Sequence, residues 1–138
     1  MKEAEQMKEF IYQNRILARL VEPADWQRGL GFFSKDQEFI QVGTWFYDKG
    51  KQLQNHVHNE FSRTAYRTYE VVYMVSGRMK VNLYTLEKEY VESFDIKEGD
   101  LLILLESGHG YEILEDNTKV LEIKNGPFSG VDIDKEKF

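Results

Sequence analysis

Residues 50–77 read GKQLQNHVHNEFSRTAYRTYEVVYMVSG, and this stretch carries the strongest pattern in the chain. His56 and His58 stand two positions apart, and side chains at that spacing on a β-strand point to the same face. The run TYEVVYMVSG is rich in β-branched and aromatic residues and ends in a Ser-Gly turn, which is typical of a strand. Glu70 lies inside this run, seven residues before Gly77. The stretch therefore predicts strands that carry polar donor groups.

His109 provides a third imidazole. It follows the apolar run LLILL and lies within SGHGYEI, and the chain contains three histidines in all. Three imidazoles and one carboxylate that converge inside a β-barrel would make a site for a divalent transition metal. This convergence is the central hypothesis about function.

The chain from residue 37 onward is patterned as β-structure almost without interruption. In RMKVNLYT, Met79, Val81 and Leu83 alternate with polar residues, which predicts a half-buried antiparallel strand. Parity also predicts that Met74 points inward and Tyr73 outward. Many short strands at spacings of roughly 8 to 12 residues favour a sandwich or barrel.

The N-terminal residues 1–36 are predicted to form an extension packed on a β-barrel domain of residues 37–138. Residues 3–13, EAEQMKEFIYQ, are rich in helix formers and predict a short helix or an extended arm. Pro23 stops any helix there. Trp26 and Trp45 are expected in the core or at an interface.

Composition excludes several classes of protein. Hydrophobic residues make up 41% and aromatic residues 14% of the 138 residues, which argues against disorder. The net charge of −6 and the scattered basic residues argue against a nucleic-acid partner. The chain has no cysteine, its N-terminus is too charged for a signal peptide, and no apolar run approaches the ~20 residues that span a bilayer. We expect a soluble, cytoplasmic protein with no membrane partner.

The motif around the histidines resembles the first motif of the cupin superfamily. In that motif a glycine, five residues and His-x-His are followed by a spacer, a glutamate, six residues and a second glycine. Gly50, His56, His58, Glu70 and Gly77 follow this order with both flanking spacings matched. The spacer of eleven residues between His58 and Glu70 is longer than the usual three or four, so residues 59–69 look like an insertion.

The second cupin motif is similar to residues 99–111. Gly99 and Asp100 open LLILL, and His109-Gly110-Tyr111 is similar to the end of the motif. Leu105 stands where proline is common, and the loop is one residue short. The resemblance covers roughly residues 38–124. It implies an all-β, double-stranded β-helix, a jelly-roll-like barrel of two antiparallel sheets, with a short N-terminal arm or helix.

The resemblance also implies that His56, His58, Glu70 and His109 bind one divalent metal ion. Neutral imidazoles with one carboxylate suit Fe(II), Mn(II), Ni(II) or Zn(II) and leave positions open for substrate. Glu60 is the competing carboxylate, because it shares strand parity with both histidines of the first motif. Glu70 is preferred for its glycine spacing.

The metal site has simpler alternatives. Each histidine could be a satisfied core or surface residue. Glu70 could be a rim carboxylate paired with Arg63 or Arg67, since surface ion pairs are common.

The insertion is rich in Arg and Tyr, a composition that suits substrate binding. Arg63, Tyr66, Arg67 and Tyr69 lie within seven residues, and guanidinium groups with aromatic rings suit an anionic or sugar-like molecule. The same residues could instead cover a barrel edge or a dimer interface. Tyr111 shares the face of His109 and is expected to line the pocket. Tyr111 and Glu60 are also the candidates for a catalytic base.

Three functions remain open at this stage. The first is a metal-dependent isomerase or dioxygenase that acts on a small polar molecule; the NGPFSG tail is similar to that of small cupins associated with surface-sugar metabolism. The second is a non-catalytic binding or sensor module with a structural metal. The third is metal-free sugar epimerisation, which needs a histidine paired with an acid. By analogy with other cupins we expect a homodimer, paired through the N-terminal arm.

Overall fold

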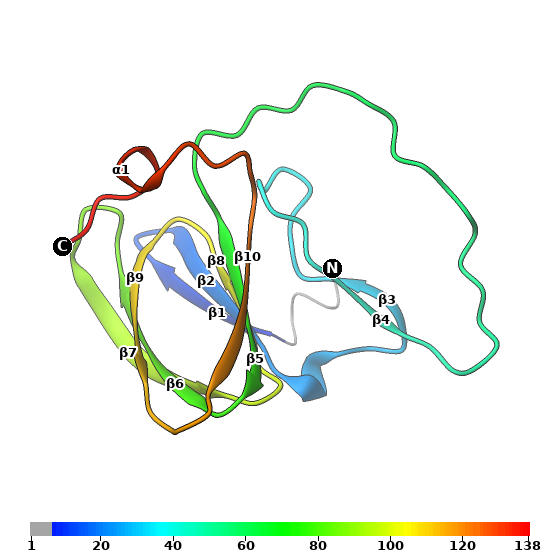
Figure 1. The fold of residues 1–138 in the computed structure, drawn as a ribbon, viewed down its shortest axis with the longest axis horizontal. Helices are drawn as coiled ribbons and strands as arrows, with labels where there is room; N and C mark the ends of the chain where they lie inside the picture. Colours follow the sequence, from blue (N-terminus) through cyan, green and yellow to red (C-terminus); the bar gives the residue numbers. More distant parts are fainter. Residues whose placement is uncertain (1–6) are drawn as a thin grey trace.

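The computed structural model describes residues 7–138, and within them the chain forms two antiparallel sheets and a separate hairpin (Figure 1). The five-stranded sheet has the order β1 (Lys8–Tyr12), β2 (Arg15–Val21), β8 (Leu101–Leu104), β5 (Glu70–Ser76) and β10 (Lys119–Lys124). The three-stranded sheet has the order β7 (Tyr90–Lys97), β6 (Arg78–Tyr84) and β9 (Gly108–Ile113). The hairpin pairs β3 (Gly29–Phe32) with β4 (Gly43–Phe46). Short helices cover Pro23–Asp25 (η2) and Val131–Asp134 (α1).

The main core lies between the two sheets. Met79, Val81 and Leu83 of β6 are buried against residues of β2, β5 and β8 in one apolar cluster, with Met74 among them. The polar residues between them on β6 are more exposed. The predicted alternation of β6 and the inward position of Met74 are thus confirmed, and so is the all-β, antiparallel class.

A second apolar cluster covers part of the outer face of the five-stranded sheet. Phe33, Ile40 and Val42, from the connection between β3 and β4, pack there on Val71 and Ile103. The connection between β3 and β4, at the loop end of the hairpin, is therefore anchored on the main sheet. Trp45, farther along the hairpin, is 62% exposed and takes no part in this cluster.

The N-terminal residues form strands of the main sheet. β2 lies between β1 and β8, and Phe10 and Leu17 are buried in the main core. Burial of these side chains against the sheet outweighs the helix propensity of the surrounding Glu, Lys and Gln residues. The extended form of the segment is therefore the one found from Lys8 onward, whereas residues 3–6 of the predicted helix or arm lie outside the described residues.

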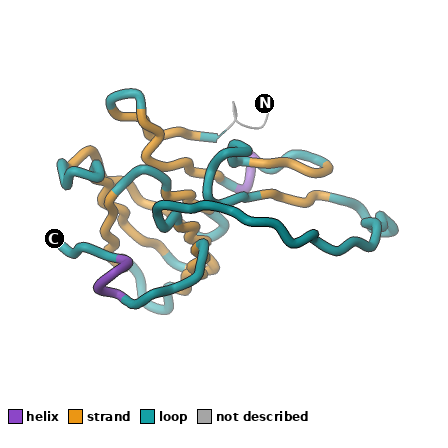
Figure 2. Tube along the Cα trace, turned by 90° about the horizontal axis from the view of Figure 1, so that it is seen from above, coloured by secondary structure: helices purple, strands orange, loops and turns teal. Residues whose placement is uncertain are grey.

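Residues 47–69, called the arm below, depart from the sequence-based expectation. The predicted strand LQNHVHN is absent, and the arm runs as an extended loop away from the two sheets (Figure 2). Among the residues that the structure describes, none makes a backbone–backbone hydrogen bond with residues 52–66. A polar strand pattern still requires a neighbouring strand for its hydrogen bonds, and residues 7–138 supply none to the arm.

The backbone conformation explains why two positions of the motifs are glycine. Gly77, between β5 and β6, has φ of +84°, and a Cβ there would lie 2.7 Å from Cα of Thr118. Gly99 has φ of +89° and faces Pro23 at a similarly short distance. Both positions need a residue without a side chain, so the glycines at the two turns fit their tight geometry.

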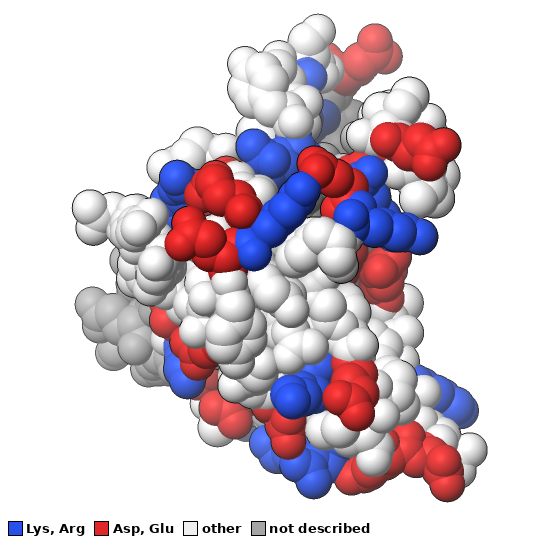
Figure 3. Space-filling model, turned by 90° about the vertical axis from the view of Figure 1, so that its left-hand side faces the viewer, with Lys and Arg blue, Asp and Glu red and all other residues white. Residues whose placement is uncertain are grey.

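Charged side chains of both signs cover the surface. On the face that carries β7, basic and acidic groups of the described residues are intermixed around a central uncharged region (Figure 3). Of the helices that the structure describes, none is long and apolar enough to cross a bilayer.

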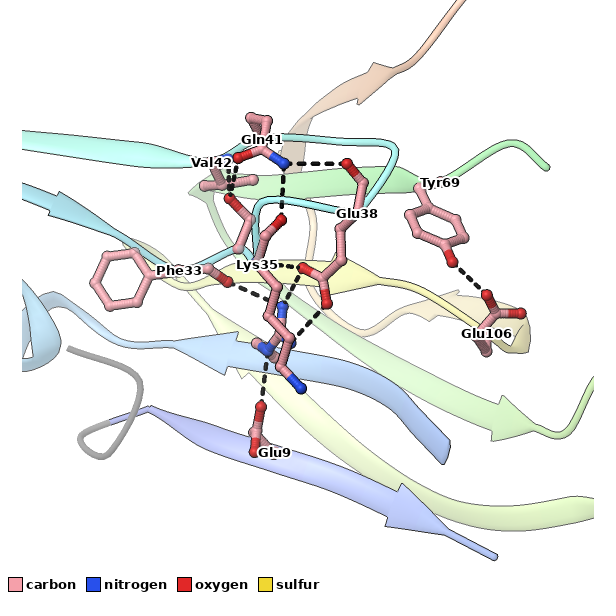
Figure 4. Close-up of polar contacts among 10 residues, drawn as sticks. Glu9, Phe33, Lys35, Glu38, Gln41, Val42, Tyr69 and Glu106 are labelled. Carbon is pink, nitrogen blue, oxygen red and sulfur yellow. Dashed lines mark hydrogen bonds and ion pairs between the residues drawn. The ribbon is translucent and has the colours of Figure 1, made fainter. Parts of the chain in front are cut away.

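Arg19 is the main charged group of the interior. On β2 it is 1% exposed, and its guanidinium donates from Nη1 and Nη2 to the two carboxylate oxygens of Glu38 at 2.6 and 2.7 Å. It also donates to Glu9 at 2.8 Å and to the carbonyl oxygen of Phe33 at 3.1 Å. Figure 4 shows Glu9 of β1 approaching from one side and Phe33 and Glu38 of the β3–β4 connection from the other. Arg19 therefore ties the β3–β4 connection to the main sheet.

Replacing Arg19 by Ala would leave Glu38 partly buried without its partner. We expect Arg19→Ala to lower the free energy of unfolding by about 3–5 kcal/mol, as for other broken buried ion pairs. Urea unfolding measures the loss. Arg15→Ala is the matched control, because the exposed pair of Arg15 with Glu87 is worth less than about 1 kcal/mol. Equal losses in the two variants would contradict this role of Arg19.

Candidate functional site

Glu70 is a buried carboxylate at the first position of β5. Its residue is 7% exposed, and β5 lies between β8 and β10, which holds the backbone from both sides. The Tyr111 hydroxyl donates a hydrogen bond to Oε2 of Glu70 at 2.7 Å. Nε2 of His109 lies 3.3 Å from the same oxygen. A carboxylate of the five-stranded sheet thus meets two polar side chains of the three-stranded sheet.

β9 places His109 and Tyr111 on one side. The two residues are two positions apart on the strand, and their ring centroids are 5.3 Å apart. Their partners on β6 are the core residues Leu83 and Val81. Nδ1 of His109 is buried and has no hydrogen-bond partner among the described residues. One ring nitrogen of His109 thus contacts Glu70, and the other is left without a partner.

The surroundings favour opposite protonation states for Glu70 and Tyr111. Burial alone would raise the pKa of Glu70, but its contacts with His109 and Tyr111 and the nearby charge of Lys124 hold this pKa below its ordinary value. Burial and the negative charge of Glu70 raise the pKa of Tyr111 far above its ordinary value. At neutral pH Glu70 is therefore an anion, and Tyr111 keeps its proton as a hydrogen-bond donor.

Glu70 and His109 line a cavity of about 900 Å³. Its other walls come from the end of the arm, the turn after β6, the start of β9 and the C-terminal tail, and they include Arg67, Thr68, Tyr84, Thr85, Lys88, Ser107 and residues 132–138. The cavity is mixed in charge, since it contains lysine, arginine, aspartate and glutamate side chains. Such a mixture, with hydroxyl groups, suits a small polar ligand.

The C-terminal tail is held at this cavity by three contacts. The Thr68 hydroxyl donates to the carboxylate of Asp134, and Lys88 forms an ion pair with Glu136. The ring of Phe138 stands edge-on to Tyr84, with centroids 5.0 Å apart. The C-terminal tail therefore lies next to the cavity and forms part of its wall.

The predicted substrate-binding residues of the insertion separate in the structure. Arg67 lines the cavity and pairs with Glu106 at 3.4 Å. Arg63 instead stacks on the ring of Phe61 within the arm, 3.8 Å from its centroid. Tyr66 is exposed, with its ring 5.9 Å from that of Phe39. Neither Arg63 nor Arg67 pairs with Glu70, so the rim-carboxylate alternative is not what the structure shows.

The predicted metal ligands form two separate pairs. Glu70 contacts His109, whereas His56 and His58 lie on the exposed arm with ring centroids 5.1 Å apart. Within residues 7–138, no group of three or more His, Asp or Glu side chains is arranged to hold a metal ion. Glu60 is exposed on the arm. The four-ligand site remains a prediction, and it requires the arm to lie elsewhere than in this conformation.

Sequence reasoning missed several residues of the cavity. Thr68, Tyr84, Thr85 and Lys88 carry no motif, and nothing in the sequence of the C-terminal tail placed it at a cavity. The sequence gives only a weak signal for Tyr84 and Lys88. Tyr84 ends β6 and Lys88 lies in the turn that follows, and polar and aromatic residues are common at such positions. Their role at the cavity depends on how the strand ends are brought together.

The low pKa of Glu70 makes a prediction for stability. A carboxyl group with a depressed pKa in the folded state stabilises the protein above its unfolded pKa, and this stabilisation is lost as the pH falls through the folded pKa. We expect Glu70→Gln to lower the free energy of unfolding by about 1–3 kcal/mol at pH 7, and the gap to close in acid. Urea unfolding from pH 7 to pH 3 measures it, with exposed Glu60→Gln as control. A gap independent of pH would contradict the assignment.

Glu70 and His109 line the polar cavity, and Tyr111 joins Glu70 across the two sheets. Tyr111, expected to line the pocket, is not among the residues that line this cavity. This geometry offers one anionic oxygen ligand, one imidazole with an unpartnered nitrogen and one phenol donor. In comparisons with known proteins, no family model, no curated protein and no solved structure matches the chain.

Proposed function

We propose that the chain is a metal-dependent cupin enzyme that acts on a small polar molecule in the cavity beside Glu70. One observation carries the proposal: the buried carboxylate of Glu70 lies 3.3 Å from Nε2 of His109, and both residues line the same polar cavity. A carboxylate oxygen and an imidazole nitrogen that face each other at the wall of a cavity are two of the ligand types that divalent transition metals prefer. The adjacent cavity supplies room for a substrate.

The residues that would hold the metal are Glu70 and His109, with His56 and His58 of the arm. A carboxylate and imidazoles fit Fe(II), Mn(II), Ni(II) or Zn(II). Glu70 is preferred to Glu60 as the carboxylate ligand, because Glu70 already contacts His109 whereas Glu60 is exposed on the arm. A metal bound there would polarise a substrate carbonyl for isomerisation or activate dioxygen.

The protein side chains suit an anionic or sugar-like substrate. Arg67 and Lys88 lie at the cavity wall, paired with Glu106 and Glu136, and a bound anion could compete for these two cations. Thr68 and Thr85 supply hydroxyl groups. Tyr111 keeps its proton and donates a hydrogen bond to Glu70, so it orients that carboxylate. Tyr111 thus acts as a positioning residue in this proposal rather than as a base. The exposed position of Glu60 gives no support to its candidacy as a base.

A non-catalytic sensor is the second candidate. It is favoured by the tail, which contacts three separate residues of the cavity wall and would respond to a ligand beneath it. In that case a bound metal would have a structural role. The two candidates share the same ligand set and differ in whether a bound small molecule is converted.

Metal content tests the proposed site. We expect purified wild-type protein, loaded with Mn(II) or Zn(II) and desalted, to retain about one ion per chain, and His109→Ala and His58→Ala to lose affinity by about tenfold or more. Elemental analysis and calorimetric titration measure this. Glu60→Ala is the control and should bind like the wild type. Equal binding in the wild type and the two histidine variants would contradict the proposal.

Turnover distinguishes the enzyme from the sensor. Protein loaded with Fe(II) should consume oxygen, or protein loaded with Mn(II) should isomerise a keto-sugar or keto-acid. Glu70→Gln should reduce the rate at least about a hundredfold, because it weakens both the metal site and the cross-sheet contact. Binding of such compounds without conversion in any metal-loaded form would favour the sensor.

A further inference from the structure

The β3–β4 hairpin presents a bare apolar face. Leu30 pairs with Trp45 in the antiparallel register, so their side chains share one face of the ribbon with Phe32. All three are exposed, Leu30 at 52% and Trp45 at 62%. Apolar side chains grouped in this way mark an interaction surface rather than isolated exposure. The hairpin face needs something to cover it.

The outer face of β5 and β10 is bare in a matching way. Leu121 and Ile123 of β10 and Val75 of β5 are exposed on that face, beside Tyr73. Only a few residues away, Val71 is buried beneath the connection between β3 and β4. One part of the sheet face is thus covered and the neighbouring part, toward β10, is not.

Backbone groups of the arm and of two strand edges have no hydrogen-bonding partner among the described residues. Within residues 7–138, β10 is paired only with β5, and β9 only with β6, so each has a free edge. Residues 52–66 are extended and make no backbone–backbone hydrogen bond with the described residues. Free strand edges are templates for pairing with another extended segment. On such an edge His56 and His58 would point to one face.

We propose that the hairpin and the arm of one protomer dock on a second copy of this chain, where His56 and His58 complete the site of the copy's Glu70 and His109. The hairpin covers the outer face of β5 and β10, and the arm lies along the free edge of β9. The inference rests on the metal site proposed above and assigns its ligands to two chains. Each protomer gives and receives the same elements, as two-fold symmetry requires.

The available area supports a second copy as the occupant. The exposed large apolar side chains of the hairpin, the arm and the β5–β10 face add up to about 1,000 Å² per protomer, if aromatic side chains count as roughly 150–250 Å² each. These are Leu30, Phe32, Trp45, Tyr47, Val57, Phe61, Tyr66, Val75, Leu121 and Ile123. A standard stable interface needs about 800 Å² per partner.

Charge also favours this pairing. The arm has four basic and two acidic residues, Lys49, Lys51, Arg63 and Arg67 against Asp48 and Glu60, for a net charge of +2. The whole chain has −6, so the rest of the chain has −8. β9, along whose free edge the arm is placed, carries exposed Glu112 and no lysine or arginine. A basic arm is therefore attracted to the acidic body of another protomer.

The arm is long enough to reach a neighbouring site. Its C-terminal end is fixed to its own sheet, where Asn125 accepts a hydrogen bond from the Tyr69 backbone and donates one to the Arg67 carbonyl. His58 lies twelve residues before Glu70, which is about 40 Å of extended chain. The ribbon leads the arm away from its own sheets (Figures 1 and 2). Both features suit exchange between chains.

A mixed dimer tests the exchange. One chain carries His56→Ala and His58→Ala, the other carries Glu70→Gln and His109→Ala, and each carries a different affinity tag. Co-expression and two-step purification give the heterodimer, which is then loaded with Mn(II) and analysed for metal. Shared ligands leave one complete site, with about half the wild-type metal per chain. Both variant homodimers should be empty.

The outcomes separate this inference from the proposed function. If the wild-type protein binds metal but the heterodimer is empty, the exchange between chains is overturned and the metal site stands. The same holds if the metal-binding wild-type protein sediments as a monomer. Wild-type protein without metal overturns the metal site. In that case Leu121→Glu still tests the docking: conversion of a wild-type dimer to a folded monomer supports it, and an unchanged dimer overturns it.

Discussion

The contact of Glu70 with His109 and Tyr111 depends on the packing of the two sheets against each other. Met74 and Val72 from one sheet and Val81 and Leu83 from the other fill the core between them. β5 brings Glu70 to the end of this core, and β9 brings the two aromatic residues to meet it. The apolar packing is what holds an anionic oxygen, an imidazole and a phenol within contact distance.

The alternation of residues made much of this arrangement predictable. The period-two pattern of β6 and the runs that became β5, β8 and β10 were visible in the sequence, because a strand with one buried face must alternate. The resemblance to the two cupin motifs implied that Glu70 and His109 meet, and their side chains are in contact, whereas His56 and His58 lie apart from them on the arm. The strand order, the two N-terminal strands and Arg19 did not follow from the sequence, since they depend on which surfaces meet after the chain folds. Sequence periodicity alone does not encode those long-range contacts.

The arm is where local and global preferences diverge. Its His-x-His spacing fits a strand, yet residues 52–66 have no backbone partner among the described residues. A strand gains stability from cross-strand contacts rather than from its own residues. In the dimer proposed above, the free edge of β9 in the second copy would supply those contacts to the arm. Sequence periodicity in the arm carries no information about such a partner.

Anomalous diffraction from crystals of the Mn(II)- or Zn(II)-loaded protein tests the central claim most directly. The account predicts one strong peak at about 2.0–2.2 Å from a Glu70 carboxylate oxygen and from a ring nitrogen of His109, with His56 and His58 completing the coordination. A peak bound elsewhere, or no peak at Glu70 in crystals that contain the metal, would contradict it.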